Sequence, residues 1–270
     1  MRTFAVIALL GFSSVSLAGV VMQMEHRDLD GPTEKPDSHV FYFQNGAFRQ
    51  EEIGDGNFNV FRNQAMYTID TKNRSYRKVD KAQMDKLGEQ LGGLRSKLEA
   101  QMKNMPAEQR AAMEQAMGKI GVGTKKEPVI TVRDTGRNET AAGIGCRVWE
   151  LLTDGSKQSE VCLAAPGSIP EGAEIVKSMR EIGSFVGGLA ATFGGKTATG
   201  LWKQLQMLNG VPVITREFGS NGKAESEQRA VSVKSSVLPA SLFEVPAGFT
   251  EKKIPGLSAG GVIGDDDDDK

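Results

Sequence analysis

Residues 145–162 read GCRVWELLTDGSKQSEVC, two runs of strand-forming residues joined by an Asp-Gly pair. Val, Trp and Leu suit strands, and Asp-Gly is typical of a tight hairpin turn. If Thr153–Gly155 forms a three-residue loop, Cys146 faces Cys162 across the hairpin. A slip of one residue would place the two thiols on opposite faces, so the turn and the cysteine spacing predict one register. We therefore predict an antiparallel hairpin closed by a disulfide between Cys146 and Cys162.

Cys146 and Cys162 are the only cysteines in the chain. In an oxidising compartment, such a pair is typical of a structural bridge. Closing a loop of this size stabilises a fold by about 3 kcal/mol in the chain-entropy model. The alternative is a redox pair, which needs a thiol of low pKa, usually in a Cys-x-x-Cys motif at the start of a helix. The chain lacks that motif, so the sequence favours the structural disulfide.

The beginning of the chain has the features of an export signal. Arg2 supplies a positive charge, Phe4–Leu10 is an apolar run too short to span a bilayer, and Ser16–Ala18 ends in small residues. This pattern predicts a signal peptide over residues 1–18, cleaved after Ala18. No cysteine follows the cleavage position directly, so we expect no lipid anchor there. The expected location is an oxidising compartment, the bacterial periplasm.

Charge excludes several classes of partner. The sequence holds 33 Lys and Arg against 34 Asp and Glu, and Asp265–Asp269 supplies a block of the acids. No basic stripe indicates nucleic-acid binding, and no later apolar run is long enough to cross a bilayer. Residues 251–270 are predicted to be a disordered acidic tail, because adjacent aspartates repel one another. This tail is either natural or an added protease-recognition sequence.

Alternating apolar residues, interrupted by turn residues, predict antiparallel strands along most of the chain. The expected strands lie at 20–26, 40–49 with a turn at Asn45-Gly46, 58–62, 65–70, 74–79, 129–132, 145–162 as the cysteine hairpin, 211–218 and 225–237. These strands indicate one domain over residues 19–250.

A helical insertion is predicted at about 80–121. Apolar residues there recur at spacings of three and four, which places them on one side of a helix. They are Met84, Leu87, Leu91, Leu94, Leu98 and Met102. Pro106 suits the first turn of a second helix, which would carry Met113 and Met117 and make the insertion a helical hairpin. Another helix is expected at about 171–185, followed by a mobile glycine-rich loop at 187–200.

Several segments resemble a known bacterial family. Tyr67–Asp70, Gly143–Trp149, Ser241–Phe249 and, in the insertion, Met105–Arg110 are similar to the domain-of-unknown-function family 4412. That family in turn resembles the LolA-like periplasmic lipoprotein carriers. The resemblance implies an α+β fold, in which a curved, unclosed antiparallel sheet wraps around helices and encloses an apolar cavity. It supplies no catalytic residues.

Catalytic motifs are not apparent in the sequence. The two histidines, His26 and His39, have no partner at zinc-ligand spacing, and no Gly-x-Ser-x-Gly motif is present. The run Gly194–Thr197 fails the phosphate-loop pattern at its first glycine position. Met102 and Met105 have a thioether-metal spacing but no adjoining histidine. We therefore expect no metal, no cofactor and no enzymatic activity.

A candidate apolar pocket follows from the aromatic residues of the first half of the sheet and from the methionines of the insertion. Unbranched thioethers suit surfaces that must fit several apolar shapes. The candidate lining residues are Phe41, Phe43, Tyr67, Leu91, Leu94, Leu98, Met113, Met117 and Trp149. The same residues would equally fill an ordinary core between the helices and the sheet.

Two functions fit these observations. The first is a non-enzymatic periplasmic protein that binds a lipid, a lipoprotein acyl chain or another apolar ligand between sheet and helices. The second is a structural or regulatory module of the cell envelope, with a filled core, that binds another protein. A cavity would favour the first function and a dry core the second.

Overall fold

The computed structural model describes residues 18–31, 35–103, 105, 106, 109, 129–192 and 209–253. The predicted signal peptide up to residue 17, the predicted second helix of the insertion and residues 254–270 of the predicted tail lie outside these ranges. The tail prediction is wrong for its first residues, because Glu251 belongs to the last strand and the Lys252 amide donates a hydrogen bond of 2.8 Å to the Tyr76 carbonyl.

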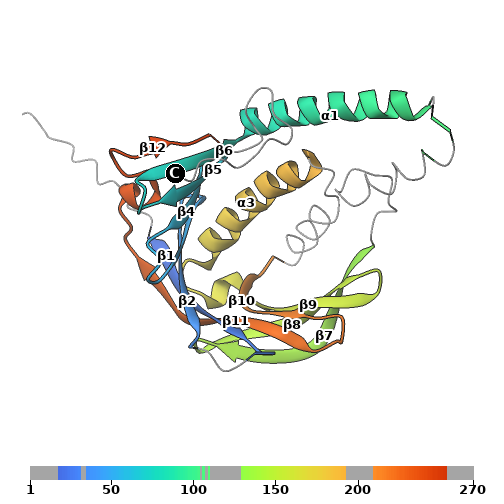
Figure 1. Ribbon diagram of the computed structural model, residues 1–270. Helices are drawn as coiled ribbons and strands as arrows, with labels where there is room; N and C mark the ends of the chain where they lie inside the picture. Colours follow the sequence, from blue (N-terminus) through green and yellow to red (C-terminus); the bar gives the residue numbers. More distant parts are fainter. Residues whose placement is uncertain are drawn as a thin grey trace, which may run out of the picture.

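One curved sheet of twelve strands organises the described chain, in the order β12-β6-β5-β4-β3-β2-β1-β11-β10-β9-β8-β7. The strands are β1 (Gly19–Asp28), β2 (Asp37–Gln44), β3 (Ala47–Glu52), β4 (Phe58–Arg62), β5 (Ala65–Asp70), β6 (Ser75–Asp80), β7 (Ile130–Ala141), β8 (Ile144–Thr153), β9 (Ser156–Ala164), β10 (Val211–Phe218), β11 (Ala224–Ser236) and β12 (Thr250–Glu251). Neighbours run antiparallel, except that β12 is parallel to β6. The sheet is strongly curved and does not close (Figure 1). The predicted curved, unclosed antiparallel sheet is therefore confirmed.

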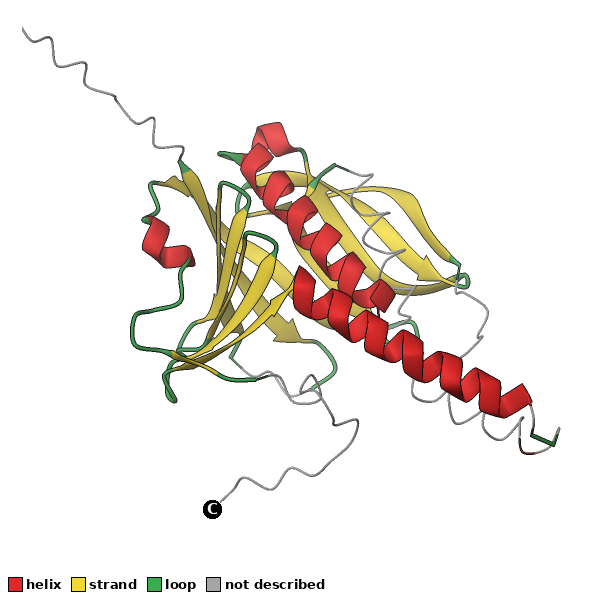
Figure 2. Cartoon of the chain, turned by 90° about the horizontal axis from the view of Figure 1, so that it is seen from above, coloured by secondary structure: helices red, strands yellow, loops and turns green. Residues whose placement is uncertain are grey.

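Two long helices lie on one side of this sheet, as Figure 2 shows. They are α1 (Lys81–Lys103), which continues directly from β6, and α3 (Gly172–Thr192), which follows the short turn η1 (Pro166–Ser168). The predicted helix at 171–185 is confirmed, but the loop prediction is wrong for residues 187–192. Two consecutive glycines cost helix stability, yet α3 continues because Ile182, Phe185 and Val186 pack against the sheet at this end.

The cysteine hairpin contains the predicted disulfide in a different register. Asp154 and Gly155 alone form the turn, both with positive φ, and Thr153 pairs with Ser156. A regular ladder from that turn would put the two thiols on opposite faces. A bulge with Gln158 as the extra residue shifts the ladder, so that Val148 lies opposite Cys162. The three-residue loop was therefore wrong, and the bulge restores the shared face on which Cys146 and Cys162 bond, with their Cα atoms 5.4 Å apart.

A bend in β7 brings strands that are not neighbours together. Its ladder with β8 is interrupted between Asp134 and Asn138, and beyond that point Figure 1 shows β7 passing beneath β10 and β11, away from α3. Arg216 of β10 donates two hydrogen bonds to Glu139 of β7, at 2.8 and 2.7 Å, and one to Glu227 of β11 at 2.7 Å. The Arg216 side chain is 16% exposed. This guanidinium therefore holds the bent end of β7 against the sheet.

The outer face of the first half-sheet is covered by the C-terminal segment around η2 (Ala240–Phe243). Arg49 lies 3.6 Å from the centroid of the Phe58 ring, pairs with Glu51 and donates a hydrogen bond to the Leu242 carbonyl at 3.1 Å. The Tyr42 hydroxyl donates to Glu51 at 2.6 Å. Burial, reinforced by this carboxylate, raises the pKa of Tyr42 to about 12. The largely buried Arg49 guanidinium therefore holds the C-terminal segment against the outer face.

The disulfide should contribute strongly to stability. We expect the double variant Cys146→Ser/Cys162→Ser to lose about 3 kcal/mol of unfolding free energy, because its unfolded chain is no longer closed into a loop. Urea unfolding followed by circular dichroism measures this loss. A reducing agent should destabilise the wild type to the same extent and leave the variant unchanged. Equal midpoints for the wild type and the variant would contradict the prediction.

The Arg216 contacts should make stability depend on acid pH. Its hydrogen bonds hold the pKa of Glu139 below the ordinary value. The stability contributed by this carboxylate is present above the ordinary glutamate pKa and is lost as pH falls through the lower folded-state pKa. We expect Glu139→Gln to cost about 2 kcal/mol at pH 7 and less at pH 3, measured by urea unfolding. The exposed Asp55→Asn is the control and should show little difference at either pH; a constant cost for Glu139→Gln would count against the prediction.

Candidate functional site

The concave face of the first half-sheet carries an apolar floor. Cross-strand partners share a face of a sheet, and here they are apolar from β1 to β6. Met22 lies opposite Phe41, and a second row continues from β2 to β6. That row consists of Phe43, Phe48, Phe61, Met66 and Val79. Alternation along each strand thus gathers aromatic and thioether side chains on one side.

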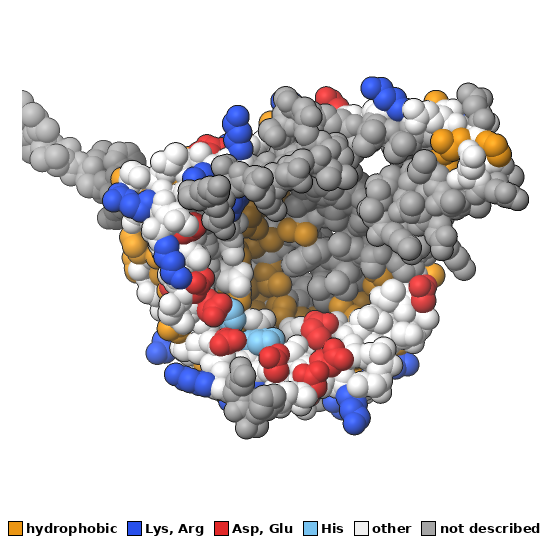
Figure 3. Space-filling model, viewed as in Figure 1, with side chains coloured by type: hydrophobic (Ala, Val, Ile, Leu, Met, Phe, Trp, Pro, Cys, Tyr) orange, Lys and Arg blue, Asp and Glu red, His pale blue; other side chains and the backbone are white. Residues whose placement is uncertain are grey.

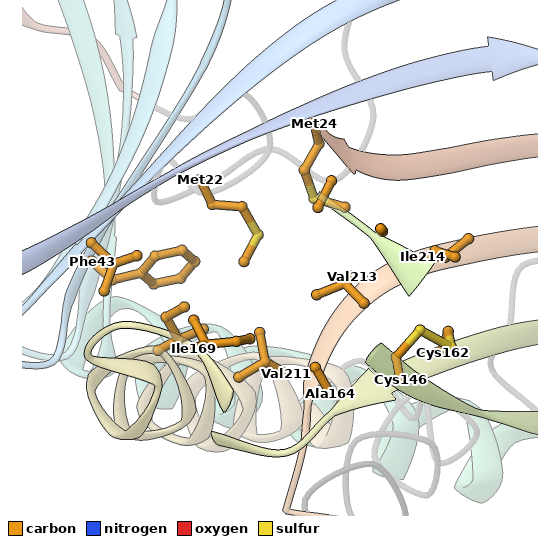
Figure 4. Close-up of a cluster of buried hydrophobic side chains, with 14 of the residues drawn as sticks. Met22, Met24, Phe43, Cys146, Cys162, Ala164, Ile169, Val211, Val213 and Ile214 are labelled. Atoms are coloured by element: carbon orange, nitrogen blue, oxygen red, sulfur yellow. A yellow bond between two sulfur atoms is a disulfide. The ribbon is translucent and has the colours of Figure 1, made fainter. Parts of the chain in front are cut away.

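Helix α3 lies on this floor. Its first half places Ile175, Val176 and Met179 in the cluster that contains Met22 and Phe43, and Figure 4 shows Phe43, Met22 and Ile169 converging. Its second half packs on the next strands, where the rings of Phe185 and Phe61 are 5.4 Å apart. The floor under the helix is therefore tightly filled.

Polar contacts anchor the first turns of α3 to the β2–β3 hairpin. Glu174 accepts a hydrogen bond of 2.7 Å from the Gly46 amide. Ser178, which is fully buried, donates to the Ala47 carbonyl at 3.2 Å. Asn45 and Gly46 both have positive φ, and a Cβ at Gly46 would lie 2.6 Å from a carboxylate oxygen of Glu181. Gly46 therefore allows the close approach of hairpin and helix.

Helix α1 has few buried side chains among those described. Met84, in its first turn, is 7% exposed and joins the cluster of Phe61 and Phe185. Beyond it, the described side chains of α1 are mostly exposed, up to Lys103. Figure 1 shows the helix extending past the edge of the sheet. Among the described side chains, those of the first turn therefore attach α1 to the sheet.

A second apolar cluster lies on the same face of the other half-sheet. Trp149, Val161 and Thr215 are opposite one another in a row across β8, β9 and β10. This row continues through Gln228 of β11 to His26 of β1, so its members lie on the same face of the sheet. The cluster comprises Leu151, Val161 and Leu163, with Val132 and Trp149 packed against them. The concave face therefore has an apolar area on each side of a polar strip.

The polar strip forms a rim at the open end of the concave face. His26 follows Met24 on the same face of β1, and His39 pairs with Met24 from β2. The acidic residues at this end are Asp28, Asp37, Glu52 and Glu217. In Figure 3, histidine and acidic side chains border a recess whose interior shows hydrophobic side chains. We call Asp28, Asp37, Glu52 and Glu217 the rim carboxylates.

The structure brings only part of the predicted pocket together. Phe41 and Phe43 lie side by side on the concave face, and Trp149 lies on the same face across the rim. Tyr67 does not join them, because it pairs with Val60 and packs in the outer cluster beside Tyr76. The side chains of Leu91, Leu94 and Leu98 lie outside the described ones, as do residues Met113 and Met117.

The sequence analysis missed several residues of the concave face. Met22, Met24 and Phe61 are almost completely buried there, and Met66 and Met179 are half-buried beside them. The alternation of Val20, Met22 and Met24 along the first strand was the available signal. The methionines of the insertion were predicted as pocket residues instead, because they stand close together in sequence.

The described residues supply no arrangement suited to catalysis by a metal. In these ranges no three His, Cys, Asp or Glu side chains are grouped so that they could hold a metal ion. Within the same residues, no helix has the length and apolarity needed to cross a membrane. The chemistry of the concave face is thus apolar contact, with carboxylates and imidazoles at its rim.

Comparison with known proteins gives likeness of fold alone. No protein-family model and no curated protein matches the chain. An uncharacterized conserved protein from Thermus thermophilus is 10% identical, with a TM-score of 0.42 over 89% of this chain and 92% of that chain. A chain of the Pseudomonas aeruginosa MucA/MucB complex is 8% identical, with a TM-score of 0.37 over 86% of this chain but 56% of that chain. A LolA superfamily protein from Nitrosomonas europaea is 7% identical, with a TM-score of 0.27 over 84% and 89% of the two chains. Membership of family 4412 stays a prediction.

The packing of α3 on the floor can be tested by truncation. We expect Phe185→Ala to lower the free energy of unfolding by about 3 kcal/mol, because it leaves a cavity beside Phe61. Ile53→Ala is the control, since Ile53 is 58% exposed, and should change stability by less than about 0.5 kcal/mol. Urea unfolding of both variants measures the difference. Equal effects would show that α3 is not firmly packed.

Proposed function

We propose that this protein is a non-enzymatic binder of an apolar ligand, a lipid or an acyl chain, which it holds between the concave face and the helices. The observation that carries this proposal is the apolar surface left accessible beside α3. Phe41, Phe48, Met66, Val79 and Met179 remain partly exposed there, although they pack against the buried clusters. A recess lined by such side chains suits a hydrocarbon chain.

The residue types on this surface support a flexible rather than a shape-specific ligand. Met66 and Met179 have unbranched, polarizable side chains that adapt to different apolar shapes. Phe41 and Phe48 lie 5.9 Å apart between ring centroids and offer flat surfaces to a methylene chain. We infer that the ligand is recognised mainly by the area that it buries.

The proposed site of action is the periplasm. The predicted signal peptide and its cleavage after Ala18 would export the chain, and the disulfide between Cys146 and Cys162 suits an oxidising compartment. The two cysteines are 6% and 2% exposed, which suits a structural bridge better than a redox pair.

A second function, a protein-interaction module of the cell envelope, is favoured by one observation. Met22, Met24 and Phe43 are 3 to 5% exposed beneath α3, so that part of the concave face is already filled by the protein itself. In this alternative the partner would be another envelope protein, and its binding site would lie outside the apolar recess.

Ligand occupancy separates the two proposals. The protein is purified from the cells that export it, and its bound material is analysed by native mass spectrometry and by lipid extraction. We expect an acyl species on the wild type and its loss from Phe41→Glu, because a charge on the concave floor opposes burial of hydrocarbon. Tyr67→Glu is the matched control, since it adds the same charge to the outer face, and should keep the ligand.

Both variants must first show cooperative thermal unfolding. A wild-type protein without ligand, which also takes up no added fatty acid or phospholipid, would contradict apolar-ligand binding and favour the interaction module. Loss of ligand from Tyr67→Glu as well as Phe41→Glu would show that the concave floor is not its specific site.

A further inference from the structure

The sequence contains three Asn-Gly pairs, and the structure places them in three different surroundings. They are Asn45-Gly46, Asn209-Gly210 and Asn221-Gly222. Asn-Gly is the pair most prone to lose ammonia spontaneously, because glycine has no Cβ to hinder attack by its own nitrogen on the asparagine side chain. All three pairs lie in described parts of the chain, and their surroundings decide which of them can react.

The reaction needs an ionised amide and a backbone that can rotate. The glycine nitrogen loses its proton and attacks the asparagine Cγ atom, a carbon–nitrogen bond forms, and ammonia leaves, so that a five-membered succinimide results. Water then opens this ring at either carbonyl and gives aspartate or isoaspartate. A carboxylate beside the amide opposes loss of the proton, since the resulting anion would face a second negative charge. Tight packing opposes the rotation that ring closure requires.

Asn45-Gly46 is protected on both counts. The Gly46 amide donates its hydrogen bond of 2.7 Å to the Glu174 carboxylate. The Glu181 carboxylate borders the same glycine, since a Cβ there would lie 2.6 Å from its Oε1 atom. Asn45 itself is exposed, but Gly46 is buried where the β2–β3 hairpin meets α3. Ring closure at this pair would therefore displace the hairpin from the helix.

Asn209-Gly210 is held by packing. Gly210 lies directly against β9, because a Cβ on it would be 2.7 Å from the Leu163 Cβ atom and 3.3 Å from the Ala164 carbonyl oxygen. Val211, the first residue of β10, follows immediately, is completely buried and pairs with Ala164. Rotation at Gly210 would therefore displace the start of a buried strand.

Asn221-Gly222 lies at the tip of the β10–β11 hairpin, in open surroundings. Residues 220–223 are all exposed, and a Cβ at Gly222 would meet no atom within 4 Å. The Gly222 amide donates a hydrogen bond of 2.9 Å to the Gly219 carbonyl, which is a neutral acceptor within the same turn. The Glu225 carboxylate borders Gly219, at the base of the turn, and leaves the space around Gly222 open.

The Asn221 side chain is already folded toward the backbone that it would attack. Its Oδ1 atom accepts a hydrogen bond of 2.8 Å from the Lys223 amide, which is the geometry of an Asx turn. The Asn221 Cγ atom therefore lies on the side of the chain that faces the Gly222 nitrogen. Since an exposed hairpin tip opens at a low cost in free energy, ring closure here displaces no buried element.

We propose that Asn221 is the site of spontaneous deamidation in this protein, through a succinimide with Gly222, while the fold protects Asn45 and Asn209. This inference does not depend on the proposed ligand. The product adds a negative charge at the tip of the β10–β11 hairpin, and isoaspartate also adds a methylene group to the backbone there.

Peptide mapping by mass spectrometry tests this assignment. The full protein is incubated in mildly alkaline buffer, and aspartate and isoaspartate are quantified at the three asparagines over time. We expect Asn221 to react about tenfold faster than Asn45 or Asn209, because only its pair reacts without opening a packed part of the fold. The same protein unfolded in guanidinium chloride is the control, since all three pairs should then react at comparable rates.

Three results with the folded protein would overturn the proposal. They are equal rates at the three asparagines, fastest reaction at Asn45 or Asn209, and an unmodified Asn221 under conditions in which the unfolded chain reacts there.

A pair of variants tests the assigned protection of Asn45. Glu174→Ala removes the acceptor of the Gly46 amide and should raise the rate at Asn45 about tenfold, with the rate at Asn221 unchanged. Glu171→Ala is the matched control, because Glu171 is exposed just before α3, and should change neither rate. Thermal unfolding shows that each variant is folded. An unchanged rate at Asn45 in Glu174→Ala would overturn the protective role of this carboxylate.

Discussion

The structure depends on the pairing of β1 with two strands that come from opposite ends of the chain. β1 lies between β2 and β11, so it joins the meander of β2–β6 to the half-sheet of β7–β11. Gly19 permits this arrangement, since a Cβ there would lie 2.7 Å from the Phe43 carbonyl oxygen and from Leu238. Val20, next to it, is completely buried. Without this central strand the two half-sheets would have no common ladder and the concave face would not exist.

Bulges in the ladders then add to the twist that regular strands already have. Bulges interrupt β1 against β11, β10 against β9, β8 against β9 and β7 against β8. A bulge increases local twist and bends a strand. The bend in β7 is held by Arg216, whose buried charge is matched by Glu139 and Glu227. Removing one partner of such a group leaves an unpaired charge, which makes the bent end sensitive to single substitutions.

The two sides of the sheet use charge differently. On the outer side, Arg49 and Arg216 are paired with carboxylates and hold segments of the chain together. At the open end of the concave side, Asp37 and Glu52 have no cationic partner among the described residues and stand beside apolar side chains. Paired charges of the first kind hold segments of the fold together, whereas the exposed carboxylates at the open end take no such part among the described residues.

The sequence by itself determined the elements whose signals are local. Alternation identified the strands, spacings of three and four identified α1, and an Asp-Gly turn with two cysteines predicted the disulfide. Tertiary structure decided the register and the faces. The Gln158 bulge cannot be read from residue types, because it follows from how β8 and β9 pack. Tyr67 was assigned to the wrong face because its orientation depends on the β3–β4 connection, whereas Phe41 and Phe43 share a face by alternation alone. In the rim, the β2–β3 hairpin brings Asp37 and Glu52 together. Glu217 of β10 is far from them in sequence, and only the pairing of β1 with both halves of the sheet places it at the same end.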